Sequence, residues 1–337
     1  MCKPTVGVIL TTFKCTASCP ECCFECTPEN DKILEYDEIV RFIQQAHAEL
    51  NIKRLIWSGG ECFLLGDDLK KGIRYGHSLG LNSRCVTNGF WAISEEVAFN
   101  TLKELKKCGL DEINFSTGDD HQLFVSEDKI FNAVIAAAKL GLRVVVSIET
   151  RKNTKVNKDT FINNPRYQRE IENTNLKKYI HIVQAVWVSY HTETIYEYIE
   201  NTEKYIGYKG CDSLFDSICL TPHKTVIGCC GLSVEYISEM TLGKLGDSLT
   251  EMYHNQTKDF LKIWLYVDGA KKVLDYVKKW NPSLEIPQFV HGCQACAYIY
   301  HNIDVQSVIR DNFTECYQEV LERFTAKQTL IELKNIY

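Results

Sequence analysis

Short apolar runs recur along residues 6–190 and are separated by longer amphipathic segments. The runs are rich in Val, Ile, Leu and Phe, which is typical of strands that are buried on both faces. The pattern predicts six strands, at Val6–Thr12, Arg54–Ser58, Ser83–Thr87, Glu112–Ser116, Arg143–Glu149 and Ile180–Val188.

The segments between these runs have helical periodicity. Two helix faces are clearest, one formed by Tyr36, Ile39, Val40, Ile43 and Leu50 and one by Ile130, Phe131, Val134 and Ala138. Gly141 follows the second face where a C-terminal cap is expected. The β-α alternation predicts a parallel sheet with right-handed crossovers, either open or curled into a partial barrel. In such sheets the active site lies at the carboxyl ends of the strands.

The pattern changes near residue 205. We expect short strands between Phe215 and Ile227, with a turn at Thr221. A long helix follows, with the spacing of Phe260, Ile263, Trp264 and Val267, and Gly269 is expected to bend it. One or two amphipathic helices are expected from Val305 on. We therefore divide the chain into an α/β domain at 1–205, a second cysteine-bearing region at 206–300 and C-terminal helices at 301–337.

The composition narrows the class of protein. The chain has 337 residues, 45% of them hydrophobic, which is enough for a sizeable core. The net charge is −6 and no Lys/Arg cluster stands out, so we expect no nucleic-acid partner. The pattern of a signal peptide or a membrane span is missing from the sequence, so we expect a cytoplasmic protein. In a reducing cytosol, the 16 Cys are better explained by metal ligation than by disulfides.

Three of these cysteines directly follow the first predicted strand. Cys15, Cys19 and Cys22 have the spacing C-x3-C-x2-C. Three thiolates can hold three irons of a [4Fe-4S] cluster and leave the fourth iron open for chemistry. A zinc knuckle is the alternative interpretation of the same residues.

With the motifs that follow, the chain resembles radical SAM enzymes. Gly59-Gly60-Glu61 comes after the second strand and is similar to the motif that holds the amino group of S-adenosylmethionine. Asn88, after the third strand, resembles the segment that flanks its ribose or carboxylate, and Ser116 stands where a ribose-hydroxyl partner is usual. The resemblance covers roughly residues 6–190 and implies a partial (β/α)6 barrel, a [4Fe-4S] cluster and S-adenosylmethionine.

Two positions depart from that family's pattern. Glu21 stands before Cys22, where an aromatic residue is usual. After Ser116 the family often has an acidic residue two positions on, but here Gly118 stands there and Asp119 follows. His121, which comes next, is given no role.

Cysteines of the second region resemble the reduced auxiliary-cluster extension of peptide-modifying radical SAM enzymes. The similar residues are Cys211, Cys229, Cys293 and Cys296. This resemblance implies one auxiliary [4Fe-4S] cluster with four thiolate ligands, although a structural zinc site fits the C-x2-C pair equally well. Cys219 competes with Cys211 as a ligand, and Lys224 occupies a position where the pattern usually has Gly.

A narrower resemblance is to the epipeptide-type peptidyl epimerases. The segment Cys15-Thr-Ala-Ser-Cys-Pro-Glu-Cys-Cys-Phe-Glu-Cys26 looks like their opening motif, and Asn88-Gly-Phe-Trp91 and the doublet Cys229-Cys230 are also similar. The resemblance implies conversion of L- to D-residues in a ribosomally synthesised precursor peptide. It also implies an external electron donor of flavodoxin or ferredoxin type.

An epimerase must return a hydrogen atom to the face opposite the one that lost it. A thiol is the best side-chain donor, and Cys230, beside an expected cluster ligand, is the candidate. The opposite assignment also remains open, in which Cys230 is the cluster ligand and Cys229 is not. Two other functions also remain open: a maturase that forms thioether or carbon–carbon cross-links in a peptide, and a metal-binding or electron-transfer protein that does not turn over S-adenosylmethionine.

Overall fold

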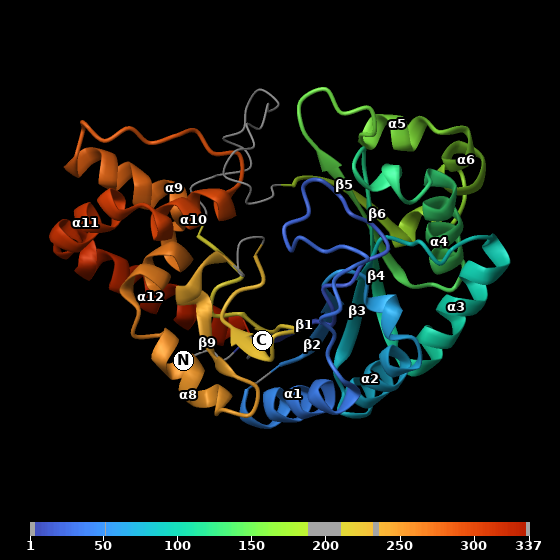
Figure 1. Cartoon of the computed structure of the whole chain (residues 1–337), viewed down its shortest axis with the longest axis horizontal. Coiled ribbons are helices and arrows are strands. Elements are labelled where there is room, and N and C mark those ends of the chain that lie inside the picture. Colours follow the sequence, from blue (N-terminus) through green and yellow to red (C-terminus); the bar gives the residue numbers. More distant parts are fainter. Residues whose placement is uncertain (1–3, 51, 188–209, 232–235, 335–337) are drawn as a thin grey trace.

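The computed structural model describes residues 4–50, 52–187, 210–231 and 236–334 (Figure 1). Its first half alternates strands with helices, as the sequence predicts. The strands are β1 (Val6–Leu10), β2 (Arg54–Ser58), β3 (Asn82–Thr87), β4 (Leu110–Thr117), β5 (Arg143–Thr150) and β6 (Ile180–Val186). The main helices between them are α1 (Tyr36–Glu49), α2 (Asp67–Ser78), α3 (Glu95–Cys108), α4 (Glu127–Lys139) and α5 (Lys158–Asn163).

These six strands are parallel and lie side by side in chain order from β1 to β6. The helices α1 to α4 run along the outer face of the sheet (Figure 1). The prediction of a parallel α/β sheet is therefore confirmed. Gly141 has a φ of 72° directly after the C-cap residue Leu140, which confirms its place at the end of α4.

The strand β1 is buried on both faces, as expected, whereas the two faces of the sheet differ in burial along β2 to β5. On β5, Val144, Val146 and Ile148 are fully buried, whereas Val145 and Ser147 are half-buried. Successive side chains point to opposite faces, so the face toward the helices is packed and the inner face is open. The inner face is therefore available to line a site.

The second half continues the same sheet. β7 (Ser217–Leu220) pairs in parallel with β1, and β8 (Thr225–Ile227) and β9 (Thr241–Lys244) follow as antiparallel strands. The described strands thus form one nine-stranded sheet in the order β6-β5-β4-β3-β2-β1-β7-β8-β9. Lys224, at the β7–β8 turn, has a φ of 62°, a left-handed conformation that glycine adopts more readily. The turn therefore keeps a glycine-like backbone although the residue is Lys.

The remaining helices gather beside β7–β9, on the left of Figure 1. They are α8 (Leu249–Gln256), α9 (Phe260–Trp280), α10 (Gly292–His301), α11 (Ile303–Asn312) and α12 (Thr314–Lys334). Gly269 interrupts α9 with a φ of 80° and a ψ of 163°, so the predicted bend is confirmed. Within the described ranges, no helix is both long and apolar enough to cross a bilayer. The predicted boundary at residue 205 lies outside the described residues.

Candidate functional site

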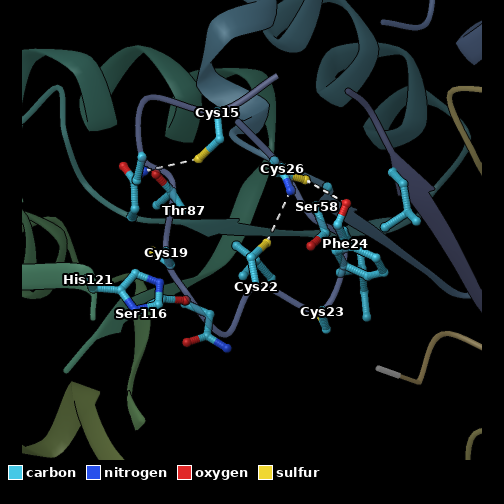
Figure 2. Close-up of a pocket in the computed structure, with 18 of the residues that line it drawn as sticks. Cys15, Cys19, Cys22, Cys23, Phe24, Cys26, Ser58, Thr87, Ser116 and His121 are labelled. Atoms are coloured by element: carbon cyan, nitrogen blue, oxygen red, sulfur yellow. Dashed lines mark hydrogen bonds between the residues drawn. The ribbon is translucent and has the colours of Figure 1, made fainter. Parts of the chain in front are cut away.

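A cavity of about 410 Å³ lies at the carboxyl ends of β1 to β4 and extends along their inner face. Most of the residues singled out from the sequence line it, although they come from separate parts of the chain. The lining includes Cys15, Cys19, Cys22, Gly59, Gly60, Asn88, Ser116 and Cys230. Figure 2 shows the three N-terminal cysteines around this space together with Ser116 and His121. The structure therefore brings both glycines and the cysteine motif to one site.

The loop of residues 11–27, which carries Cys15, Cys19 and Cys22 and is called the cysteine loop below, is held by backbone hydrogen bonds within itself. Cys15 N–H donates to the carbonyl of Thr27 at 3.0 Å, and Cys22 N–H donates to the carbonyl of Cys19 at 3.1 Å. Burial raises the pKa of Cys15 to about 11 and also raises that of Cys19. Hydrogen bonding from the thiol of Cys26 lowers the pKa of Cys22 to about 6. Metal ligation requires the thiolate form, which Cys22 reaches most easily.

The two glycines after β2 allow the next loop to lie directly against the cysteine loop. Gly60 N–H donates to the carbonyl of Thr12 at 2.6 Å, and a Cβ at Gly60 would lie 2.2 Å from the carbonyl oxygen of Lys14. Gly59 has a φ of 115°, and its Cβ would lie 2.4 Å from the carbonyl oxygen of Thr12. Any side chain at either position would push the two loops apart.

Glu61 is fully buried and lies outside the cavity lining. Its carboxylate accepts hydrogen bonds from Asn88 N–H at 2.9 Å, from Phe63 N–H at 3.0 Å and from the hydroxyl of Thr87 at 2.9 Å. Burial raises its pKa to about 7, while these donors act in the opposite direction. In this structure the carboxylate therefore holds the loops after β2 and β3 together.

Asn88 and Ser116 stand at the ends of the next two strands. Ser116 is buried at the end of β4. The Asn88 side chain donates to the hydroxyl of Thr16 at 3.1 Å and to the sulfur of Cys15 at 3.6 Å. The amide of Asn88 is therefore directed at the cysteine loop.

The second group of cysteines comes from three parts of the chain: Cys211 precedes β7, Cys229 follows β8, and Cys293 and Cys296 lie in α10. Burial raises the pKa of Cys229, and the neighbouring thiols of Cys211, Cys230 and Cys293 raise it further. Burial also raises the pKa of Cys296, with smaller effects from Cys293 and Cys211. A Cβ on Gly231 would lie 3.0 Å from the sulfur of Cys293 and 3.1 Å from that of Cys229.

All members of this donor set are soft thiols, which suit either an iron–sulfur cluster or tetrahedral zinc. Across the described residues, no three His, Cys, Asp or Glu side chains come close enough to hold a single metal ion. Cys219 is fully buried in β7, and its thiol faces the carbonyl of Leu220 at 3.7 Å. Cys211, by contrast, lies near Cys229 and Cys296, because its thiol contributes to raising the pKa of both.

Cys230 lines the first cavity, whereas its neighbour Cys229 is buried. The Cys230 sulfur accepts a hydrogen bond from the hydroxyl of Ser217 at 3.5 Å and lies 3.9 Å from the hydroxyl of Ser213. Cys230 therefore lies between the second group of thiols and the cavity that holds the first.

A polar network between His121 and Glu149 also lies at this cavity, although no sequence motif points to a role for either residue. His121 lines the cavity, and its Nδ1 lies 2.8 Å from Oε2 of Glu149. The same carboxylate accepts the backbone N–H groups of Asp120 and His121. Gly118 allows this approach, since a Cβ there would lie 2.0 Å from Cγ of Glu149. The sequence contains one indication of this network, because His121 follows β4 closely and Glu149 lies near the end of the adjacent parallel strand β5.

Known proteins share sequence and fold features with this chain. YydG of Bacillus subtilis (strain 168), a protein provisionally named for peptide biosynthesis, is 22% identical over 312 residues, covering 90% of this chain and 94% of that protein. The structure of anSMEcpe with bound AdoMet and the Cp18Cys peptide superposes with a TM-score of 0.57 at 14% identity, covering 96% of this chain and 99% of that one. Nearly the whole of this chain therefore shares the fold of anSMEcpe. Residues 9–150 match the Radical SAM superfamily, and this part of the chain is a radical SAM domain.

Proposed function

We propose that this chain is a radical SAM enzyme that modifies a ribosomally synthesised peptide, and that it converts L- to D-residues. The similarity to YydG and the fold shared with anSMEcpe support a peptide as the substrate. The observation that carries the epimerase assignment is the position of Cys230, in the same cavity as Cys15, Cys19 and Cys22. A hydrogen-atom donor has to reach the place where the radical forms.

The chain's own residues supply two binding sites in this proposal. The residues that would hold a [4Fe-4S] cluster and S-adenosylmethionine are Cys15, Cys19, Cys22, Gly59, Gly60, Asn88 and Ser116, and the buried Glu61 would support them by holding the loops after β2 and β3 together. When bound, these groups supply a carbon-centred radical that removes a Cα hydrogen from the peptide. Cys211, Cys229, Cys293 and Cys296 would hold an auxiliary cluster.

Cys230 then transfers the hydrogen atom of its thiol to the opposite face of the peptide carbon. A C–H bond forms and the S–H bond breaks, which leaves a sulfur-centred radical on Cys230. One electron and one proton restore the thiol. We infer that an external donor of flavodoxin or ferredoxin type supplies the electron, and the hydroxyl of Ser217, 3.5 Å from the sulfur, is positioned to return the proton.

The first experiment needs no peptide. The protein is reconstituted with iron and sulfide without oxygen, reduced and mixed with S-adenosylmethionine, and 5′-deoxyadenosine is quantified. We expect the product with the wild type and none with Cys15→Ala/Cys19→Ala/Cys22→Ala. If the wild type binds zinc, takes up no iron and forms no product, the enzyme assignment is wrong.

The second experiment separates epimerisation from cross-linking. The enzyme is incubated in D2O with a candidate precursor peptide. An epimerised residue gains one deuterium at Cα, because the Cys230 thiol exchanges with the solvent. A thioether or carbon–carbon cross-link instead removes two hydrogen atoms, so a mass decrease without deuterium would favour the alternative function.

A further inference from the structure

His121 is buried in the wall of the cavity but leaves one ring nitrogen open to it. The residue is 6% exposed, and its Nδ1 lies 2.8 Å from Oε2 of Glu149. Figure 2 shows His121 on one side of the cavity and Cys23 and Cys26 on the other. The Nε2 of His121 has no hydrogen-bond partner among the described residues and is not one of the fully enclosed polar atoms. This nitrogen therefore faces the cavity that the residue lines.

The direction of Nε2 is fixed by the groups around the ring. Glu149 is 5% exposed, and its Oε1 accepts the backbone N–H groups of Asp120 and His121. The carboxylate cannot turn away without leaving these buried donors unpaired. The His121 ring also packs edge-on against Trp187, with ring centroids 4.6 Å apart and an interplanar angle of 82°. Because the ring is already ordered, a ligand that bonds Nε2 loses little affinity to side-chain ordering.

The charges around His121 favour a neutral ligand. Glu149 pairs with the His121 ring, and Asp120 pairs with Arg151 at 2.6 Å. Together these groups carry no net positive charge in either protonation state of His121, so an anionic ligand such as a carboxylate gains no electrostatic stabilisation here. A main-chain amide is neutral and has both an N–H and a C=O group. It can therefore pair with Nε2 whether this nitrogen accepts or donates.

His121 and Cys230 reach the cavity from opposite parts of the sheet. His121 follows β4 and its partner Glu149 lies near the end of β5, whereas Cys230 follows β8. In the strand order, β3, β2 and β1 lie between these two parts, and the loops after them carry Asn88, Gly60 and the cysteine motif. A peptide that is held at His121 can therefore extend across the cavity toward Cys230.

We propose that His121 binds the precursor peptide through a hydrogen bond between Nε2 and one of the peptide's main-chain amides, and that Glu149 is the residue that positions the ring. This role of His121 rests on the proposed function only in taking a peptide as the substrate, and it holds equally for epimerisation and for cross-linking. A bond to the main chain orients the peptide without selecting a side chain. It therefore contributes to binding and orientation and not to the radical step itself.

Steady-state kinetics with a candidate precursor peptide test this role. His121→Asn keeps an amide donor at the place of Nδ1 and has no atom at the place of Nε2, so the bond to Glu149 can form without the bond to the peptide. We expect KM for the peptide to rise about tenfold with little change in kcat, because binding common to the ground state and the transition state is lost. The Kd for S-adenosylmethionine should match that of the wild type. His121→Gln carries its amide closer to the place of Nε2 and should restore part of the affinity.

An amide-to-ester scan of the same peptide locates the bond. In the wild type, one ester linkage should raise KM about tenfold. The same ester should have little further effect in His121→Asn, because its partner is already missing. If His121→Asn fails to fold, His121→Gln replaces it in this comparison. His254→Asn is the matched control and should keep the wild-type KM, since His254 is exposed on α8 and does not line the cavity.

Two kinds of result would overturn the role of His121. The first is an unchanged KM in His121→Asn, or effects of ester and substitution that add at every position of the peptide. The second is a weaker Kd for S-adenosylmethionine in His121→Asn, which would place His121 in the cofactor site. A wild type that forms 5′-deoxyadenosine but leaves every candidate peptide unmodified would instead contradict the proposed function, and the role of His121 with it.

Discussion

Cys229 and Cys230 are adjacent in the chain but face different surroundings. The Cys229 sulfur accepts the backbone N–H of Gly231 at 3.1 Å and is buried among the thiols of the second group. Cys230 lines the cavity that also contains Cys15. A ligand and a hydrogen donor have opposite requirements, because the first must be enclosed with other thiolates and the second must reach the substrate.

Replacement of each member of the doublet should therefore separate two functions. Cys230→Ala is expected to keep the full iron content and to form 5′-deoxyadenosine, but to yield no D-residue. Cys229→Ala is expected to lose the iron of the auxiliary site. Iron analysis and chiral amino-acid analysis of the peptide check both outcomes. A D-residue formed at the wild-type rate by Cys230→Ala would show that the donor is another group.

Gly60→Ala is expected to damage the site through a clash alone. Its Cβ would lie 2.2 Å from the carbonyl oxygen of Lys14, so the cysteine loop must move. Forcing extra volume into a packed site costs about 1–3 kcal/mol of the free energy of unfolding. We expect a lower melting temperature and weaker binding of S-adenosylmethionine to the reconstituted protein.

Gly292→Ala is the control for this substitution, because a Cβ at Gly292 meets no heavy atom within 4 Å. It should melt near the wild-type temperature. Equal stability of Gly60→Ala and Gly292→Ala would mean that the loops can separate without cost.

Glu61 should make the stability of the iron-free protein depend on pH. Its pKa is raised from 4.5 to about 7, so its contribution to stability is full below pH 4.5 and is lost as the pH rises through 7. The loss amounts to about 3 kcal/mol. Glu61→Gln removes this titration. The free energy of unfolding of the variant, relative to that of the wild type, should therefore increase between pH 5 and pH 8.

Urea denaturation at several pH values measures that difference. Other groups, including Cys22, titrate in the same range, but they are common to both proteins and cancel in the comparison. Parallel pH profiles of the two proteins would contradict the assignment of this titration to Glu61.

Glu149→Leu should destabilise the protein by leaving buried donors without an acceptor. Glu149 is 5% exposed and accepts the N–H groups of Asp120 and His121 as well as pairing with the His121 ring. Loss of these bonds is expected to cost about 3 kcal/mol in urea denaturation. Glu104→Ala removes a carboxylate that pairs with Lys107 at the surface and should change stability by less than about 0.5 kcal/mol. A similar effect of both substitutions would show that the network contributes little.

Local patterns in the sequence were enough to predict the six parallel strands, the bend at Gly269 and the order of the motifs after the strands. Each of these depends on local information. Apolar periodicity reports which face of an element is buried, and a motif after a strand of a parallel sheet reaches the same edge as the others.

Contacts between distant parts of the chain could be seen only in the folded structure. The parallel pairing of β7 with β1 brings Cys230 to the cavity of Cys15. The loops after β2 and β3 enclose Glu61, and the amide of Asn88 is directed at a sulfur. These contacts join residues far apart in the chain, and they depend on packing and on the burial of polar groups rather than on any local pattern.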